Sequence, residues 1–207
     1  MSRGMLKHPG LNLGPHHPEA HEASEKLMFG FWVFLMSDLI LFGLVFATYA
    51  SMANPIGRAG GPGPQDVFNL MSVALQTAIL LVSSYAFGLA SLALKYRPAQ
   101  LVRWLVVTLM LGLLFLVLET RDLLGMLSAD AGPWRSGWLS AFFALIPLHG
   151  LHVAVGCLWL AVMLVQMRAL GLTTPVKLRL MRLSLFWHFL DIIWIGIFSI
   201  VYLEGLA

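Results

Sequence analysis

The chain has 207 residues, of which 59% are hydrophobic and only 11% are charged. Soluble domains carry roughly 25% charged residues, so this composition excludes a water-soluble globular protein. The formal charge of +3 does not indicate nucleic-acid binding, because the basic residues lie in short loops beside apolar segments, where membrane topology places them. The chain length therefore sets a number of membrane spans, each of about 20 apolar residues.

A polar N-terminal segment precedes the first apolar run. Residues 1–26 are rich in His and Glu and lack the apolar stretch of a secretory signal peptide. We expect them to form a cytoplasmic polar tail. A tail of this kind holds its histidines in no fixed geometry, so we do not expect it to bind a metal ion.

Five apolar runs follow, each long enough to cross the ~30 Å of hydrocarbon in a bilayer. Backbone polar groups in lipid must be satisfied within their own segment, so each run is predicted to be an α-helix. Loops that contain Pro and Gly separate the runs and end the helices. The sequence thus predicts an all-α polytopic membrane domain over 27–207, a bundle of five transmembrane helices. The predicted spans are 27–50, 70–94, 101–118, 139–165 and 183–203.

The basic residues are distributed unequally between the two sides of the predicted bundle. On one side lie Arg3, Lys7, Lys26, Lys95, Arg97, Arg103, Arg168, Lys177, Arg179 and Arg182. On the other side lie Arg58, Arg121 and Arg135. Because cytoplasmic loops carry an excess of Lys and Arg, we expect a cytoplasmic N-terminus and a periplasmic C-terminus. An odd number of spans requires the same arrangement.

Several ionisable side chains interrupt the apolar spans. They are Asp38, Glu119, Asp122, His149, His152, His188 and Asp191. A charge at the bilayer centre costs at least about 2.5–3.5 kcal/mol, so such groups are expected to face the bundle interior or a protein neighbour. The i,i+3 spacing places His149 beside His152 on the fourth span, and His188 beside Asp191 on the fifth.

These groups allow more than one interpretation. The three span histidines fit neutral imidazoles that hydrogen-bond across helices, haem or metal ligands, or a proton relay. A bis-histidine haem needs two histidines on facing helices at matching depth. Asp38 fits a packing contact or a proton-handling carboxylate, and Glu119 and Asp122 fit carboxylates at the rim near Arg121. We find no catalytic triad, phosphate loop or zinc motif, and we predict no catalytic, cofactor-binding or metal-binding residue.

Three longer motifs lie on the predicted helices. Residues 29–38 read FGFWVFLMSD, residues 148–153 read LHGLHV, and residues 184–194 read SLFWHFLDIIW. In this order they resemble motifs of the haem–copper terminal oxidase subunit III family, and the resemblance extends over 29–205. Asp38 falls where that family carries a buried carboxylate, and the span histidines and Asp191 fall on its two histidine motifs.

Within that family, the five spans and the ending at 201–205 are most similar to the cytochrome o ubiquinol oxidase branch. The resemblance implies accessory subunit III of a proton-pumping quinol oxidase in the bacterial plasma membrane, which supports assembly, lipid binding and proton uptake. It implies a large haem–copper catalytic subunit I, a subunit II, a small subunit IV and membrane phospholipid as partners. It also implies that haems, copper and quinol belong to the catalytic subunit.

The sequence departs from the family pattern at three positions. One is Pro147, which is unusual directly before the LHGLHV motif. Gln76 stands where relatives often carry Glu, and Arg121 stands where an aromatic residue is typical. Subunit III of a cytochrome c oxidase and a homologue associated with nitric oxide reductase are the alternative family functions. More distant alternatives are a self-contained b-haem carrier, motivated by the span histidines, and a small proton transporter, motivated by Asp38 and the His188/Asp191 pair.

Overall fold

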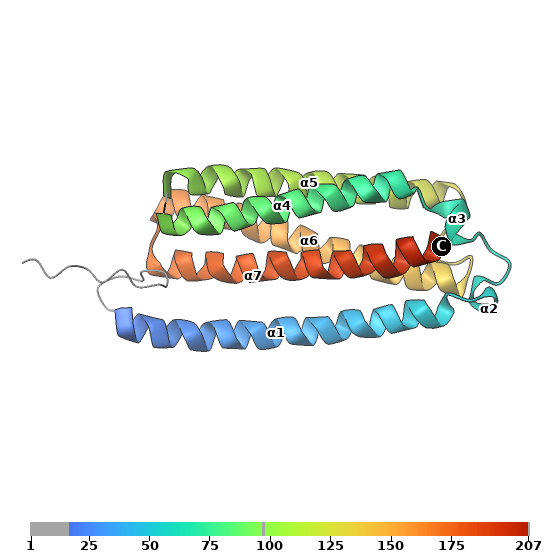
Figure 1. Cartoon of the computed structure of the whole chain (residues 1–207), viewed down its shortest axis with the longest axis horizontal. Coiled ribbons are helices and arrows are strands. Elements are labelled where there is room, and N and C mark those ends of the chain that lie inside the picture. Colours follow the sequence, from blue (N-terminus) through green and yellow to red (C-terminus); the bar gives the residue numbers. More distant parts are fainter. Residues whose placement is uncertain (1–16, 97, 207) are drawn as a thin grey trace, which may run out of the picture.

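The computed structural model describes residues 17–96 and 98–206, and this part of the chain is helical. The long helices are α1 (His17–Met52), α4 (Leu70–Tyr96), α5 (Pro98–Ser128), α6 (Gly137–Leu170) and α7 (Thr174–Ile197), which continues as the π-helical turn η1 (Phe198–Leu203). The short helices are α2 (Pro55–Arg58), α3 (Pro64–Val67) and α8 (Glu204–Leu206). Five helices are long and apolar enough to cross a membrane (Figure 1), which confirms the predicted fold class.

The helices extend beyond the apolar runs that predict them. α1 begins at His17 rather than at residue 27, α5 continues to Ser128, and α7 begins at Thr174 rather than at residue 183. High hydropathy marks only the part of a helix that crosses lipid. Good helix formers such as Ala and Glu can extend the same helix into water. Part of the predicted polar tail is therefore helical, and its residues 1–16 lie outside the described residues.

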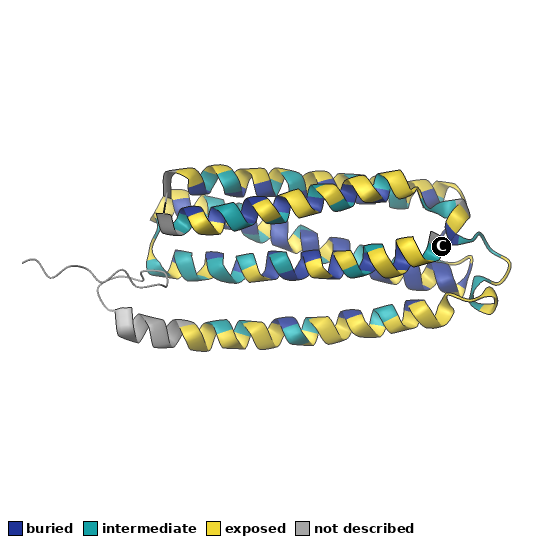
Figure 2. Ribbon diagram, in the orientation of Figure 1, coloured by how far each residue is buried: buried dark blue, intermediate teal, exposed yellow. Residues whose placement is uncertain are grey.

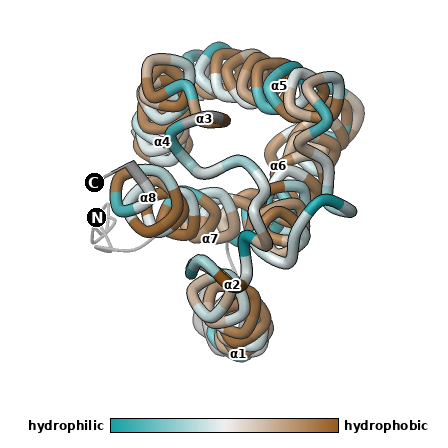
Figure 3. Tube along the Cα trace, turned by 90° about the vertical axis from the view of Figure 1, so that its right-hand side faces the viewer, coloured by the Kyte–Doolittle hydropathy of each residue, from teal (hydrophilic) through white to brown (hydrophobic). Residues whose placement is uncertain are grey.

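The five long helices pack as a ring of four with α1 at one side. Seen along the bundle, α4, α5, α6 and α7 surround a common interior, and α1 lies apart from them (Figure 3). α4 packs most extensively on α5, α6 packs on α5 and α7, and α1 packs mainly on α6. Figure 2 shows the result: α1 is mostly exposed, whereas α6 and α7 have many more buried positions.

A tryptophan fills the centre of the ring. The indole of Trp187 on α7 lies between Gly112 of α5 and Gly156 of α6, and it is buried. A Cβ atom added at Gly112 would lie 2.8 Å from the indole and 2.9 Å from the Cys157 Sγ, and one added at Gly156 would lie 3.2 Å from the indole. Small residues at these positions allow the helices to approach closely.

Aromatic rings close the end of the bundle that carries α2 and α3. Tyr202 of η1 packs against Phe68, with ring centroids 4.7 Å apart, and Phe68 in turn packs against Trp138 at 5.7 Å. The Tyr49 hydroxyl donates a hydrogen bond to the Val201 carbonyl over 3.4 Å. This bond connects α1 to η1 at the same end of the molecule.

Candidate functional site

A histidine and a carboxylate connect α1 to α6. The Asp38 Oδ2 lies 3.4 Å from the His152 Nε2. The His152 Nδ1 lies 2.7 Å from the Leu148 carbonyl, which can only accept, so the hydrogen on this ring is at Nδ1. The contact between the His152 Nε2 and the Asp38 Oδ2 is attractive when one of these two atoms carries a further proton. The pair is thus a polar link between α1 and the ring of four helices, and it can hold a proton.

The Asp38–His152 pair lies at an apolar pocket. This pocket has a volume of about 280 Å³ and lies between α1, α6 and α7. Its other lining residues are Phe34, Leu151, Val155, Trp159 and Phe186. The pair therefore lies beside a surface that suits hydrocarbon.

His149 is buried and contacts α7 rather than α1. Its Nε2–H donates to the Leu190 carbonyl over 3.3 Å. The ring lies edge-on to Phe115 at 5.8 Å and beside Trp194 at 5.1 Å, measured between ring centroids. This hydrogen bond joins α6 to α7. It has the geometry of a neutral imidazole that hydrogen-bonds across helices.

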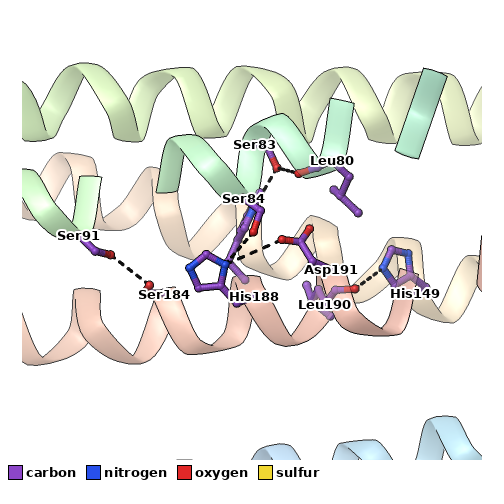
Figure 4. Close-up of polar contacts among 10 residues, drawn as sticks. Leu80, Ser83, Ser84, Ser91, His149, Ser184, His188, Leu190 and Asp191 are labelled. Atoms are coloured by element: carbon purple, nitrogen blue, oxygen red, sulfur yellow. Dashed lines mark hydrogen bonds and ion pairs between the residues drawn. The ribbon is translucent and has the colours of Figure 1, made fainter. Parts of the chain in front are cut away.

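His188 and Asp191 form a second polar group with α4 (Figure 4). The His188 Nδ1 lies 2.7 Å from the Ser84 Oγ and 4.0 Å from the Asp191 Oδ2. The His188 side chain is 41% exposed, whereas the Asp191 side chain is 8% exposed. Within the described part of the chain, neither carboxylate oxygen of Asp191 receives a hydrogen bond.

Glu119 points into the bundle, so the rim interpretation is wrong for this residue. It is 4% exposed and fills the space that Gly150 of α6 leaves open: a Cβ atom added at Gly150 would lie 2.5 Å from the Glu119 Oε2. Arg121 is exposed. Residues two positions apart lie on opposite sides of an α-helix, so the Arg121 side chain does not lie beside the Glu119 carboxylate.

Asp122 is held by α4. Its Oδ2 accepts hydrogen bonds from the Ser72 hydroxyl over 2.5 Å and from the Gln76 amide over 2.7 Å. Gln76 is buried. An amide donor at this position satisfies the facing carboxylate, whereas a second carboxylate would oppose it with like charge. Gln76 therefore supplies a buried donor to the Asp122 carboxylate.

Sequence reasoning missed the hydroxyl groups of α4. The Trp187 indole N–H donates to the Ser83 hydroxyl over 3.2 Å, and the Trp194 indole N–H donates to the Thr77 hydroxyl over 3.0 Å. The spacing of the hydroxyl residues could have indicated this. Thr77 and Ser84, which contacts His188, are seven residues apart in an apolar span, and this spacing places both on one face of a helix. That face is directed at α7.

The structure separates the predicted polar residues into distinct contacts. The two histidines of α6 bind different neighbours, and His188 binds Ser84 of α4. Among the described residues, no group of three or more His, Cys, Asp or Glu side chains could hold a metal ion. The arrangement can hold protons and join helices.

Five apolar helices with polar contacts between them define a polytopic helical membrane protein. The sequence model for cytochrome c oxidase subunit III matches residues 10–206. The chain therefore belongs to the cytochrome c oxidase subunit III family, as the three motifs predicted.

Relatives in this family match the chain nearly from end to end. The chain is 47% identical over 194 residues to the cytochrome bo(3) ubiquinol oxidase subunit 3 of Pseudomonas aeruginosa, which covers 93% of this chain and 92% of the relative. The protein of that name from Pseudomonas putida is 44% identical over 186 residues, or 89% of each chain. The quinol oxidase subunit 3 of Bacillus subtilis is 36% identical over 187 residues, or 90% of this chain and 91% of the relative.

Proposed function

We propose that the chain is accessory subunit III of a proton-pumping quinol oxidase, which oxidises quinol and reduces oxygen to water. One observation carries the proposal: relatives named as subunit 3 of ubiquinol and quinol oxidases match at least 86% of the chain, in species of Pseudomonas, Buchnera, Bacillus and Staphylococcus. The five-span architecture supports it.

In this proposal the redox chemistry belongs to a neighbour. Haems, copper and quinol reside in the large catalytic subunit, and this chain associates with that subunit, with subunit II and with a small subunit IV. The contacts of the span histidines support this division, because each described imidazole is hydrogen-bonded or paired within the chain itself.

The accessory role is to stabilise the complex and to support proton uptake. The Asp38–His152 pair can hold a proton at the edge of an apolar pocket. The same pocket, lined by aromatic and aliphatic side chains, suits the acyl chain of a membrane phospholipid. We assign both features to the support of the catalytic subunit rather than to catalysis.

The proposed location is the bacterial plasma membrane, with the N-terminus in the cytoplasm and the C-terminus in the periplasm. The helices run in alternating directions, so α1 and α7 begin at the same end of the bundle, and α8 lies at the opposite end (Figure 1). Lys26, Arg103 and Arg168 lie toward the end where α1 begins, and Arg58 and Arg135 toward the other. The positive-inside rule supports this orientation.

Affinity purification through this chain from bacterial membranes tests the proposal. We expect a large haem-containing subunit to co-purify, and the complex to consume oxygen with ubiquinol as electron donor. Oxygen consumption with reduced cytochrome c and not with ubiquinol would assign the chain to a cytochrome c oxidase instead. Recovery of the chain without any haem-containing subunit would refute the proposal.

A spectrum of the isolated chain tests the most distant alternative. A self-contained b-haem carrier would show haem absorbance when purified without other subunits. We expect no such absorbance, because a bis-histidine haem needs two histidines on facing helices at matching depth, whereas His149, His152 and His188 each contact a different neighbour within the chain.

A further inference from the structure

A second pocket lies at the end of the bundle that carries α2, α3 and α8, the end that faces the viewer in Figure 3. Its volume of about 360 Å³ is in the range of small-molecule sites. The walls come from the loop before α3, the start of α4, the last turns of α5 and η1. We call it the α4–α5 pocket and define it by Phe68, Val73, Arg121, Asp122, Met126 and Tyr202.

The α4–α5 pocket lies where two membrane spans reach the end of their apolar runs. On α5 the apolar run covers 101–118, or about 27 Å at a rise of about 1.5 Å per residue, which nearly spans the ~30 Å of hydrocarbon. Arg121 and Asp122 follow this run within one turn. On α4 the apolar run begins at Leu70, and Asn69, which also lines the pocket, directly precedes it. The pocket is therefore at the depth of the lipid headgroups.

Arg121 brings an unpaired positive charge to the pocket. The side chain is exposed and lines the pocket. Within the described part of the chain it forms neither an ion pair nor a hydrogen bond. A free guanidinium at headgroup depth is suited to the bidentate hydrogen bonding of a phosphate group.

Asp122 brings the opposite charge to the same pocket. Its Oδ2 accepts hydrogen bonds from the Ser72 hydroxyl and the Gln76 amide, and in the described part of the chain no hydrogen bond reaches its Oδ1. Asp122 is next to Arg121 in the sequence, but the two side chains do not form an ion pair. The pocket therefore presents a cation and a carboxylate oxygen that are each available to a ligand.

The other defining side chains of the α4–α5 pocket are apolar or aromatic. Val73 of α4 and Met126 of α5 are buried, and the Tyr202 ring packs on Phe68 with centroids 4.7 Å apart. Such a wall suits hydrocarbon rather than a water-soluble ion. The ligand that matches the pocket carries a negative group, a positive group that donates hydrogen bonds, and an apolar part.

We propose that the α4–α5 pocket binds a membrane phospholipid with a phosphoethanolamine head. The phosphate accepts hydrogen bonds from the Arg121 guanidinium, and the ammonium donates to the Asp122 Oδ1. The acyl chain lies against Phe68 and Met126. An anionic lipid without an ammonium group would place its charge beside the Asp122 carboxylate with nothing to offset it. This site is separate from the pocket between α1, α6 and α7, and it needs only the membrane-embedded bundle, whichever oxidase holds the chain.

The substitution Arg121→Gln tests the phosphate contact. Native mass spectrometry of the full chain, purified in detergent and titrated with dioleoyl phosphatidylethanolamine, measures the affinity. We expect about tenfold weaker binding, which corresponds to about 1.4 kcal/mol. The matched control is Arg135→Gln, an exposed arginine at the same end of the bundle that does not line the pocket. Unchanged binding by Arg121→Gln, or an equal loss with Arg135→Gln, would overturn the proposal.

The substitution Asp122→Asn tests recognition of the ammonium group. We expect the wild-type chain to prefer dioleoyl phosphatidylethanolamine over dioleoyl phosphatidylglycerol, and the variant to lose most of this preference. The ratio of the two affinities separates a change in selectivity from a general loss of binding. No preference in the wild-type chain, or the same preference in the variant, would overturn the proposal. Inorganic phosphate that binds as tightly as the lipid would identify an ion site and would overturn it too.

The substitution Gly125→Leu fills the pocket without touching either charge. Gly125 lines the pocket, and a Cβ atom added there would meet nothing within 4 Å, so the chain has room for the new side chain. We expect a loss of phosphatidylethanolamine binding of at least about tenfold. Gly43→Leu on α1 is the control, because that position is equally open and lies outside the pocket. Full binding by Gly125→Leu would show that the lipid does not occupy the α4–α5 pocket.

Discussion

Helices α1 and α7 are equally convincing membrane spans by sequence but differ in how they are held. The mean hydropathies of their apolar stretches are 2.1 and 1.8. Yet only 11% of the apolar stretch of α1 is buried inside the chain, compared with 50% of the apolar stretch of the span formed by α7 and η1. α7 packs against α4, α6 and α1, whereas α1 packs mainly on α6. Apolar character therefore shows that a helix crosses the membrane and not how strongly its neighbours hold it.

The contacts of the two helices differ in kind as well as in extent. α7 is held by close packing, with Trp187 between two glycines of neighbouring helices. α1 is held largely by individual contacts: Asp38 on His152, Phe42 on the same imidazole and Tyr49 on Val201. We expect volume changes to affect α7 most and changes of polar partner to affect α1 most.

The largest effect is expected for Trp187→Ala. The substitution empties the centre of the ring, and deletion of a large buried aromatic side chain lowers the free energy of unfolding by about 3–5 kcal/mol. Denaturation of the purified chain in detergent micelles measures this change. Trp32→Ala on α1 is the control, because Trp32 is exposed, and an equal loss there would contradict the difference between the helices.

Gly112→Ala is expected to destabilise the chain by about 1–3 kcal/mol, since overpacking a close contact forces its neighbours to move. The added carbon meets both the Trp187 ring and the Cys157 sulfur. Gly43→Ala on α1 meets nothing within 4 Å and should be neutral or stabilising by up to about 1 kcal/mol, through helix propensity. The same denaturation series compares the two variants, and equal effects would show that α1 is packed as tightly as α7.

Asp38→Asn is expected to weaken the attachment of α1 by about 1–2 kcal/mol, because an amide replaces the carboxyl group that contacts His152. In the complete oxidase, initial oxygen consumption should stay near normal, while the enzyme inactivates sooner during turnover. Repeated measurements of oxygen consumption over time show both. The exposed Asp130, changed to Asn, is the control. Complete loss of oxygen reduction in a fully assembled complex would contradict the accessory role of this chain.

The smallest effect is expected for Ser83→Ala. It removes the hydroxyl that accepts the Trp187 indole N–H, and hydrogen bonds between membrane helices contribute about 0.6 kcal/mol on average. Ser37→Ala on α1 removes a hydroxyl that donates to Phe34 of its own helix and should change the free energy of unfolding less. A larger effect at Ser37 would show that this part of α1 depends on that hydroxyl.

Hydropathy and helical spacing predicted much of this molecule. The five spans follow from the length of the apolar runs, and the inward-facing polar groups follow from the cost of placing them in lipid. The i,i+3 spacing correctly related His188 to Asp191, whose side chains are 4.0 Å apart. Helix ends were less accurate, because helices continue into water where hydropathy no longer marks them.

Contacts between helices could not be predicted from spacing alone. The partner of His152 is Asp38, more than 100 residues away, and that pairing depends on which helix of the ring α1 packs against. Likewise, Gln76 is explained only by its contact with Asp122. The position of Glu119 was predictable: the helical repeat separates it from Arg121, but the nearby charge favoured the rim interpretation.

The slot between Gly112 and Gly156 that holds the Trp187 indole has a consequence for biosynthesis. α4, α5 and α6 precede α7 in the chain, so the ribosome completes them first. At about 5–20 residues per second, the 30 residues of Thr174–Leu203 require a few seconds more. During this interval the two glycines of the slot line an unfilled groove in the membrane. Close packing at the centre of the bundle is therefore complete only after the last span has been made.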